Sequence, residues 1–328
     1  MNNQIEIRIY PRFDAFYYSF YLLGLFRHFG KYHKSSFTLQ DFPPFPSNIF
    51  AISTSDNKRV IIDANDTPSI NSFGAEWCSI YGKINYYNEI IPERFKSKIV
   101  PIGPSFAVRL WSLLPTFYYA LQNTITSRNI FDRNRDFYAN YFRQYAYRQK
   151  ESNYQRSKSS DNYIFSLSSL WKKESETNKL RALFINSCKS LPNINFEGGF
   201  APRHHNDILG FENLTISKRY KIDEYLEKTK HSFVVFNTPA VLGCLGWKLG
   251  EFLALGKAII STPLKREMPA PLIHGKDIHF VDGTGGSMLK AITLIHENRN
   301  YKEELELNAR KYYENYLSPE KVIEKLFT

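Results

Sequence analysis

Two charged residues close to a pair of glycines form a pattern that is well suited to bind a phosphorylated ligand. Lys248 and Glu251 are three residues apart in a predicted helix over Trp247–Leu255, so their side chains share one flank of that helix. The flank begins one turn from the helix N-terminus, where free backbone N–H groups and the positive end of the helix dipole favour anions. Gly243 and Gly246 precede the helix and allow a phosphate to approach it closely.

The two side chains suit different parts of a nucleotide. Lys248 can neutralise a diphosphate, and the carboxylate of Glu251 can accept hydrogen bonds from ribose hydroxyls. Thr238 follows a predicted strand that ends near Phe236, and together with Gly246 it completes this group of candidate ligand-binding residues. The same spacing also fits an ordinary ion pair on the polar face of an amphipathic helix, which is a common arrangement.

A second group of polar residues follows the predicted strand Tyr163–Leu167. Asn178 and Arg181 lie in a helix expected over Glu174–Ser190, and Lys172 lies in the loop that precedes it. The guanidinium of Arg181 suits bidentate contacts with phosphate oxygens. These residues are candidates for the same ligand, and the alternative for each cation is a solvated surface charge.

The loop after the next predicted strand adds glycines and a further cation. Gly198 and Gly199 are expected to follow the strand end, where a tight turn can lie beside a ligand. Arg203 comes next and is a candidate for phosphate binding. His204 and His205 follow it, but adjacent histidines rarely point at one ion and no third ligand is near, so we do not expect a metal site there.

The order and spacing of these features resemble the C-terminal donor domain of GT-B glycosyltransferases. The segment is similar to the exostosin-like and fucosyltransferase-like branches and to bacterial family 1 transferases of surface polysaccharide synthesis. Those enzymes carry a basic residue, a glutamate three positions later, an Ala/Leu-rich helix and a glycine before a strand, as in Lys248, Glu251 and the string LALGKAII. Asn178 and Arg181 match the Asn-x-x-Arg pattern of the fucosyltransferase-like branch. Gly243 stands where many retaining GT-B enzymes have a second glutamate.

This resemblance, which covers Tyr163–Asp282, implies an α/β fold of the GT-B kind: two Rossmann-like domains with a cleft between them. We expect an N-terminal acceptor-binding domain over residues 1–155 and a C-terminal nucleotide-sugar-binding domain over residues 156–328, whose last helix can pack back on the first domain. The polar, Ser-rich segment Glu151–Asp161 marks the boundary. Strand–helix alternation in the second half also favours parallel βαβ units, which bind ligands at the carboxyl ends of their strands.

The N-terminal half offers carboxylates for chemistry on the acceptor, which the GT-B resemblance assigns to this domain. Asp14 follows the predicted strand Ile5–Ile9 and begins a helix expected to run to Phe29. It can act as a base on an acceptor hydroxyl, or simply cap the helix. Asp63 and Asp66, at another predicted strand end, are rivals. Neither forms a DxD motif, so we expect no essential metal.

Two aromatic-rich stretches suggest contact with lipid. The helix expected over Asp14–Phe29 is apolar nearly all round, which indicates a buried helix or, alternatively, partial exposure at a membrane interface. The segment Arg128–Lys158 has eight basic and three acidic residues beside a helical stripe of aromatic rings. It can bind anionic lipid or a lipid-pyrophosphate acceptor, stack on a nucleic acid strand, or form a packed stripe with a solvated basic face.

Composition limits the kinds of partner and site that we expect. A net charge of +11 over 328 residues attracts phosphates of any kind, and the length favours two domains. Cys78, Cys188 and Cys244 are isolated, which argues against a zinc site or a disulfide framework. The sequence shows no signal-peptide pattern and no apolar run long enough to span a bilayer, so we expect a cytoplasmic protein, with the inner face of the plasma membrane as a further location.

The resemblance implies a hexosyltransferase-like glycosyltransferase that moves a sugar from a UDP- or GDP-sugar to a glycan or lipid-linked acceptor, in cell-surface polysaccharide or lipopolysaccharide synthesis. Arg181, Lys248 and Glu251 would hold the donor, without a cofactor. One alternative is a basic nucleic-acid-binding protein, but the sequence has no helix-turn-helix, RRM or zinc-finger signature, and we expect no nucleic acid partner. Another is a sugar-binding scaffold that keeps the fold and lacks catalysis.

Overall fold

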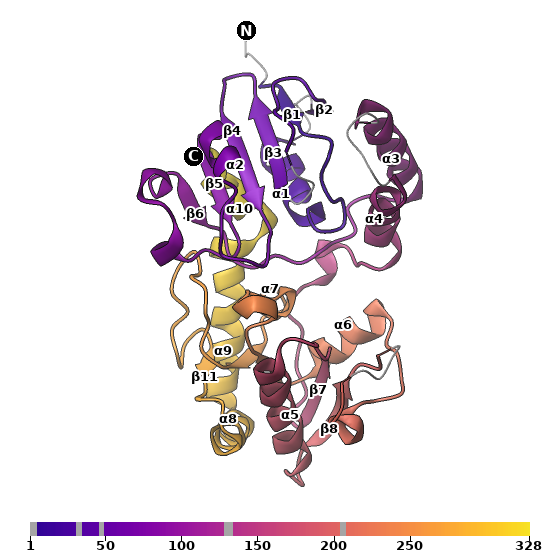
Figure 1. Cartoon of the computed structure of the whole chain (residues 1–328). Coiled ribbons are helices and arrows are strands. Elements are labelled where there is room, and N and C mark those ends of the chain that lie inside the picture. The colour runs from indigo at the N-terminus through magenta and orange to yellow at the C-terminus, as the bar shows by residue number, and fades with distance from the viewer. Residues whose placement is uncertain (1–4, 31–34, 46–48, 128–133, 204–207) are drawn as a thin grey trace. The chain divides into compact units, whose positions relative to one another are not determined.

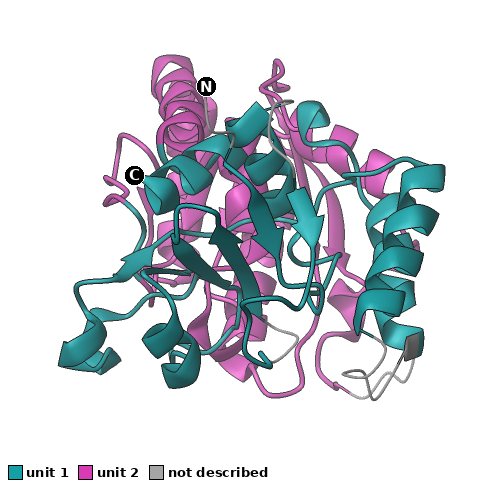
Figure 2. Cartoon of the chain, turned by 90° about the horizontal axis from the view of Figure 1, so that it is seen from above, with its two compact units in different colours: residues 1–153, 267–269, 316–328 teal, residues 154–266, 270–315 magenta. Residues whose placement is uncertain are grey.

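The computed structural model describes residues 5–30, 35–45, 49–127, 134–203 and 208–328, and it divides the chain into two compact units (Figures 1 and 2). Unit 1 comprises residues 1–153, 267–269 and 316–328, and unit 2 comprises residues 154–266 and 270–315. The chain passes from unit 1 to unit 2 between Asn153 and Tyr154, and its last helix belongs to unit 1 again.

Unit 1 is built on a six-stranded sheet of order β2-β1-β3-β4-β5-β6. Its strands are β1 (Ile7–Ile9), β2 (Ser35–Phe37), β3 (Ile49–Thr54), β4 (Arg59–Asp63), β5 (Ile80–Lys83) and β6 (Ile99–Pro101). β3 is antiparallel to β1 and β4, whereas the other neighbouring pairs are parallel. The carboxyl ends of β1, β4, β5 and β6 therefore meet at one edge of the sheet, which places the chain after Ile9 and after Asp63 at that edge.

The helices of unit 1 come from the N-terminal part of the chain and from its C-terminus. They are α1 (Ser19–Phe29), α2 (Ser72–Trp77), α3 (Leu113–Ser127), α4 (Asn134–Ala146) and α10 (Pro319–Phe327). Most of α1 is buried, including Tyr18 just before it and Phe20 and Tyr21 within it, so the prediction of a buried aromatic helix is confirmed. Short 3-10 turns lie at Asn88–Ile90, Glu93–Phe95 and Glu151–Asn153.

Apolar patterns in the sequence also predict a strand over Ile84–Tyr87 and a helix from Phe106 to about Gln122, and the structure places both elements elsewhere. The strand expected at Ile84–Tyr87 is wrong, because β5 lies at Ile80–Lys83 and the following residues form a turn. The helix expected to start at Phe106 begins at Leu113 instead. Phe106 and Val108 are fully buried in chain without regular secondary structure. Apolar spacing alone does not separate such a buried extended segment from the first turns of a helix.

Gly24 allows α1 and α10 to approach each other closely. A Cβ atom at this position would lie 2.1 Å from the carbonyl oxygen of Pro319, which no packing arrangement tolerates. We expect Gly24→Ala to lower the free energy of unfolding by about 1–3 kcal/mol because the two helices must separate. Urea denaturation measures this loss.

Gly286→Ala provides the control for this prediction. Gly286 lies in the first turn of α8, and a Cβ there would meet nothing within 4 Å. Its substitution should leave the unfolding midpoint unchanged or raise it slightly. An equal loss of stability in both variants would contradict the close approach of α1 and α10 as the cause.

Unit 2 is built on parallel strands. They are β7 (Tyr163–Ser168), β8 (Asn195–Phe200), β9 (Val234–Asn237), β10 (Ala258–Ser261) and β11 (His279–Phe280). β7 pairs with β8, and β9 and β11 flank β10. The backbone N–H of Phe233 donates to the carbonyl of Tyr163 over 2.9 Å, so β7 lies next to β9.

The order of these strands in space is therefore β8-β7-β9-β10-β11. The chain first adds β8 on one side of β7 and then continues with β9 on its other side, so the sheet has a topological switch point between β7 and β9. Such a switch point, at the carboxyl ends of the strands, is where α/β sheets bind ligands. The helices between the strands are α5 (Ser175–Lys189), α6 (Ile222–His231) and α7 (Trp247–Ala254), and α8 (Gly285–Glu297) and α9 (Arg299–Tyr312) follow β11. The α/β fold with parallel strands that the sequence predicts is confirmed.

The core of unit 2 lies between these strands and helices. Phe184 of α5 stacks on Phe236 of β9 with ring centroids 4.6 Å apart, and Met288 and Ile292 of α8 belong to the same cluster of buried side chains. A π-helical turn over Tyr313–Leu317 extends α9 and leads the chain back to unit 1.

Gly198 and Gly199 lie within β8 and not after it, which corrects the expected loop. Their φ angles of 119° and 147° are strained for other residues. A Cβ on Gly198 would lie 2.0 Å from the carbonyl oxygen of Ser166, and one on Gly199 would lie 2.3 Å from that of Leu214. Both glycines therefore permit close backbone packing around β8, and a contact of Gly199 with a ligand stays a prediction.

Candidate functional site

Three cations from separate elements bond to the backbone at the carboxyl end of β7. Nη1 of Arg181 in α5 and Nη1 of Arg203 after β8 each donate to a carbonyl oxygen over 2.7 Å, and Nζ of Lys248 in α7 donates to a third. The acceptors are, respectively, the carbonyls of Ser169, Leu170 and Leu167. We call Arg181, Arg203 and Lys248 the β7 cation cluster. It gathers three of the candidate residues at the switch point between β7 and β9.

Asn178 fixes the loop to which Arg181 and Arg203 bond. Its Oδ1 accepts from the N–H of Trp171 over 3.0 Å, and its Nδ2 donates to the carbonyl of the same residue over 2.8 Å. The side chain is buried, with 2% of its surface exposed. Asn178 therefore holds the loop between β7 and α5 in shape. Direct binding of a ligand by Asn178, as the sequence suggests, stays a prediction.

Burial weakens the protonated form of Lys248. Loss of hydration lowers the pKa of its ammonium to about 7, with further lowering from the positive charge of Arg181 and partial compensation from Glu251. Burial also lowers the pKa of Arg181 to about 10. Positive charge in this cluster is thus costly, and a bound anion would stabilise it.

Glu251 lies in the interior of unit 2, on the same helix as Lys248. Only 5% of its surface is exposed, and its Oε2 accepts a hydrogen bond from the hydroxyl of Tyr225 over 3.1 Å. Burial and the charge of Glu251 raise the pKa of Tyr225 well above its usual value. The ring of Tyr225 also lies 5.8 Å from Nζ of Lys248. Sequence reasoning missed Tyr225, because it belongs to an ordinary amphipathic helix and meets these residues only in the fold.

Lys248 is enclosed to a greater extent than the sequence suggests. A cavity of about 10 Å³ beside it, bordered by β7, β9 and α7, has room for one water molecule at most. Trp171 and Lys172, in the loop between β7 and α5, are exposed.

Thr238 and Gly246 border the same edge of the sheet. The hydroxyl of Thr238, after β9, accepts a hydrogen bond from that of Thr262, after β10, over 3.0 Å. Gly246 is the N-cap of α7, and a Cβ there would lie 3.4 Å from the Cβ of Ala240, an ordinary contact. Packing alone does not require glycine at this N-cap. Ligand contacts of both residues stay predictions.

Asp14, in unit 1, caps the turn before α1. Its Oδ1 accepts from the N–H groups of Phe16 and Tyr17 over 2.9 and 3.1 Å, and its Oδ2 accepts from Nδ2 of Asn140 over 2.6 Å. The regular helix starts only at Ser19, so the expected start at Asp14 is corrected. Burial raises the pKa of Asp14, which is the direction that a general base requires.

The two rival carboxylates in unit 1 have opposite surroundings. Asp63 is fully buried, lies 3.0 Å from Nζ of the equally buried Lys83, and accepts a hydrogen bond from the hydroxyl of Tyr81 over 2.5 Å. Such an enclosed ion pair has no access to a substrate, so Asp63 is a structural residue. Asp66 is exposed.

The described residues show neither a metal centre nor a membrane span. Within these residues, no group of three or more His, Cys, Asp or Glu side chains is placed to hold an ion. His204 and His205 lie outside the part of the chain that the structure describes. No described helix is both long enough and apolar enough to cross a bilayer.

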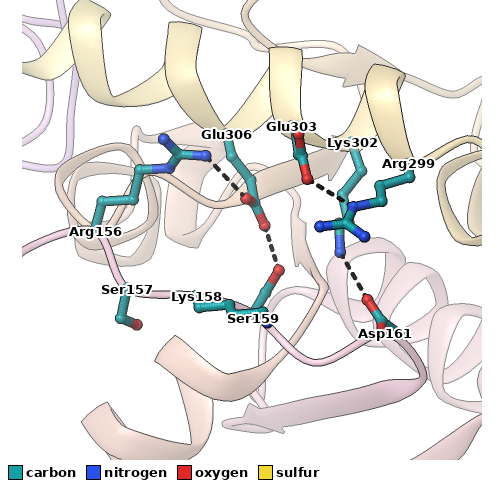
Figure 3. A pocket seen from close by; sticks show the side chains of 9 residues that line it. All are labelled: Arg156, Ser157, Lys158, Ser159, Asp161, Arg299, Lys302, Glu303 and Glu306. Atoms are coloured by element: carbon teal, nitrogen blue, oxygen red, sulfur yellow. Dashed lines mark hydrogen bonds and ion pairs between the residues drawn. The ribbon is translucent and has the colours of Figure 1, made fainter.

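A larger pocket of about 500 Å³ in unit 2 is lined by charged residues of α9 and of the segment before β7 (Figure 3). Its charges pair with one another: Arg299 with Glu303 over 2.8 Å, Lys302 with Asp161 over 3.5 Å, and Arg156 with Glu306 over 3.4 Å. Because both signs of charge are present and paired, this pocket is a weaker anion site than the β7 cation cluster.

Comparisons with known proteins identify similar backbones. A scan with protein-family models and a search of curated protein sequences each find no match. A glycosyltransferase from Rickettsia africae aligns with 82% of this chain and 68% of its own, with 11% identity and a TM-score of 0.46. The C-terminal domain of the group 1 glycosyl transferase LpcC from Francisella tularensis aligns with 50% of this chain and 96% of its own, with 11% identity and a TM-score of 0.36.

A further similar structure was solved with a bound nucleotide sugar. Anabaena HepE in complex with UDP-glucose aligns with 81% of this chain and 97% of its own, with 11% identity and a TM-score of 0.38. Two of these three structures are named glycosyltransferases, and the similar structures also include the UDP-GlcNAc 2-epimerase of Neisseria meningitidis, with 12% identity over 78% of this chain and 63% of its own and a TM-score of 0.39. At these identities and scores the similarity concerns the backbone alone, and function has to be argued from this chain's own residues.

Proposed function

We propose that the chain is a glycosyltransferase that binds a nucleotide sugar at the β7 cation cluster. The observation that carries the proposal is the convergence of Arg181, Arg203 and Lys248 on three carbonyls at the carboxyl end of β7. This convergence lies at the switch point of a parallel sheet, where phosphorylated ligands bind. The depressed pKa of Lys248 supports it, because a diphosphate would supply the charge that the buried ammonium lacks.

The cluster also fits the chemistry of sugar transfer. When the glycosidic bond to the donor breaks, negative charge grows on the departing diphosphate. Fixed cations at that point stabilise the transition state more than the ground state, and they can replace a divalent metal. The donor is a UDP- or GDP-sugar in this proposal, with Glu251 near its ribose and the exposed indole of Trp171 available to stack on its base.

Unit 1 supplies the acceptor site in this proposal, as the resemblance to GT-B enzymes implies. The acceptor is a glycan or a lipid-linked intermediate of surface polysaccharide or lipopolysaccharide synthesis, processed in the cytoplasm or at the inner face of the plasma membrane. Asp14 is the candidate base for the acceptor hydroxyl. Its raised pKa supports this role.

Asp14→Asn tests the proposed base. Asparagine retains an oxygen that can accept from the N–H groups of Phe16 and Tyr17, so the turn should persist. We expect kcat for sugar transfer to fall by about a hundredfold, with the donor dissociation constant unchanged. Asp136→Asn, at an exposed carboxylate of α4, is the matched control and should keep full activity. Equal kcat values for the Asp14 variant and the wild type would remove Asp14 from the mechanism.

A screen of nucleoside diphosphates and their sugars tests the proposal as a whole. A ligand that binds the native state raises its unfolding temperature, so thermal shifts identify the nucleotide, and transfer assays with the chelator EDTA present test independence from metal. Donor binding without transfer or hydrolysis would indicate a sugar-binding scaffold. Salt-sensitive binding of single-stranded RNA or DNA, with no nucleotide-sugar binding, would indicate the nucleic-acid alternative.

A further inference from the structure

Helix α3 in unit 1 has its polar side buried and its apolar side exposed. The residues that it buries are Thr116, Ala120, Asn123 and Ser127. Two of these bond to α4: Nε2 of Gln144 donates to the hydroxyl of Thr116 over 3.1 Å, and Asn123 donates to the hydroxyl of Tyr141. This is the reverse of the usual arrangement for a helix on a globular domain, in which the apolar side faces the core.

The exposed side of α3 is a continuous apolar stripe. It consists of Leu114, Phe117, Tyr118, Leu121 and Ile125, which are between 55% and 80% exposed. Their spacing of three, four and seven residues places them on one face over three turns. No residue of α3 is charged. Exposed apolar surface of this extent and continuity marks a docking face.

The charge around this stripe is positive. Phe142 of α4 contacts Phe117 with ring centroids 4.7 Å apart, and Arg135, two turns earlier on the same face of α4, is exposed. The described residues 110–127 and 134–150 contain four basic residues and one acidic residue. An anionic partner complements this charge. A second copy of the chain, itself at +11, would add like charge to like charge.

We propose that the stripe on α3 docks unit 1 to the surface of an anionic lipid bilayer. The helix would lie in the plane of the interface, with its aliphatic and aromatic side chains among the acyl chains and the arginines of α4 at the headgroups. At 15 residues α3 is too short to span the membrane. The sequence left lipid contact open for two stretches. The burial of α1 rules out that alternative for the helix expected over Asp14–Phe29, whereas part of the segment Arg128–Lys158 forms α4 beside the stripe.

Co-sedimentation of the full chain with lipid vesicles tests this proposal. We expect binding to vesicles of equal parts phosphatidylglycerol and phosphatidylcholine, weaker binding to phosphatidylcholine alone, and release by salt. The triple variant Leu114→Ser/Leu121→Ser/Ile125→Ser should reduce partitioning into the anionic vesicles by at least about tenfold. All three side chains are exposed, so the fold should be retained.

A matched triple variant separates the stripe from general hydrophobicity. Leu209, Leu294 and Leu307 are also exposed but lie in unit 2, and their replacement by serine should leave vesicle binding unchanged. Equal binding by the α3 variant and the wild type, or no binding by the wild type, would overturn the proposal. Concentration-dependent dimers that the α3 variant loses would identify a second copy as the occupant. Nucleotide binding by the α3 variant should match the wild type, so this test is independent of the proposed donor site.

Discussion

Lys248→Met is expected to weaken the binding of UDP or GDP by at least about thirtyfold, because it removes a charge-assisted contact worth roughly 2 kcal/mol. Methionine has nearly the length of lysine and is apolar, so it fills the same space between β7 and α7 without the charge. Isothermal titration calorimetry of the purified chain, without divalent metal, measures the change. Glu251→Ala should weaken binding as well, through loss of a proposed ribose contact and of the hydrogen bond from Tyr225.

Stability distinguishes this result from misfolding. The pKa of Lys248 shows that the folded protein disfavours its charge, so replacing it with a well-packed apolar residue should keep or raise the unfolding midpoint. Lys189→Met, at an exposed lysine at the C-terminal end of α5, is the control and should change affinity by no more than a few fold. Weaker nucleotide binding by Lys248→Met with retained stability would place Lys248 in the binding site. Unchanged affinity would contradict the proposed donor site.

The sequence predicts the skeleton of unit 2 well, because its elements have strong local signals. The short apolar run after Gly256 predicts a strand over Ala258–Ser261, which is β10, and the helix that carries Lys248 and Glu251 starts where expected, after Gly246. A C-terminal glycine, a short apolar run and a clear 3.6-residue period define these elements without tertiary information.

The contacts of the candidate site follow from tertiary structure and were not predictable in this way. Arg181, Arg203 and Lys248 are up to 67 residues apart, and nothing local indicates that all three bond to the end of β7 and the loop after it. The role of Asn178 in holding that loop is equally non-local. Periodicity also cannot say which side of α3 faces the protein, since that depends on the polar partners which α4 provides.

The protonation state of Lys248 yields the second large effect. In the free protein its pKa is about 7, far below the usual value for lysine, because burial disfavours the charged form. A bound diphosphate would favour the ammonium and raise this pKa again. Above about pH 7 binding must therefore take up a proton, and affinity for UDP or GDP should fall by as much as about tenfold per pH unit.

Stability of the unliganded protein should follow the opposite trend. Because the pKa of Lys248 is lower in the folded state than in the unfolded state, the unfolded chain binds more protons as soon as the pH exceeds about 7, and the contribution of this group to stability rises with pH until the usual lysine pKa. Lys257, whose pKa burial lowers to about 8, contributes in the same direction. The difference in the pH dependence of unfolding free energy between the wild type and Lys248→Met is the contribution of Lys248.

Calorimetry in buffers of different ionisation enthalpy would count the protons taken up on binding, with one proton per complex expected near about pH 8.5. Lys248→Arg provides the matched control, since an arginine remains charged throughout this range and should bind UDP or GDP with little dependence on pH. A dissociation constant for the wild type that stays constant between about pH 7 and 9 would show that the ammonium of Lys248 does not face the ligand's charge. With rising pH we therefore expect affinity to fall and stability to rise. A surface lysine, which stays charged in the free, bound and unfolded states, would produce neither trend.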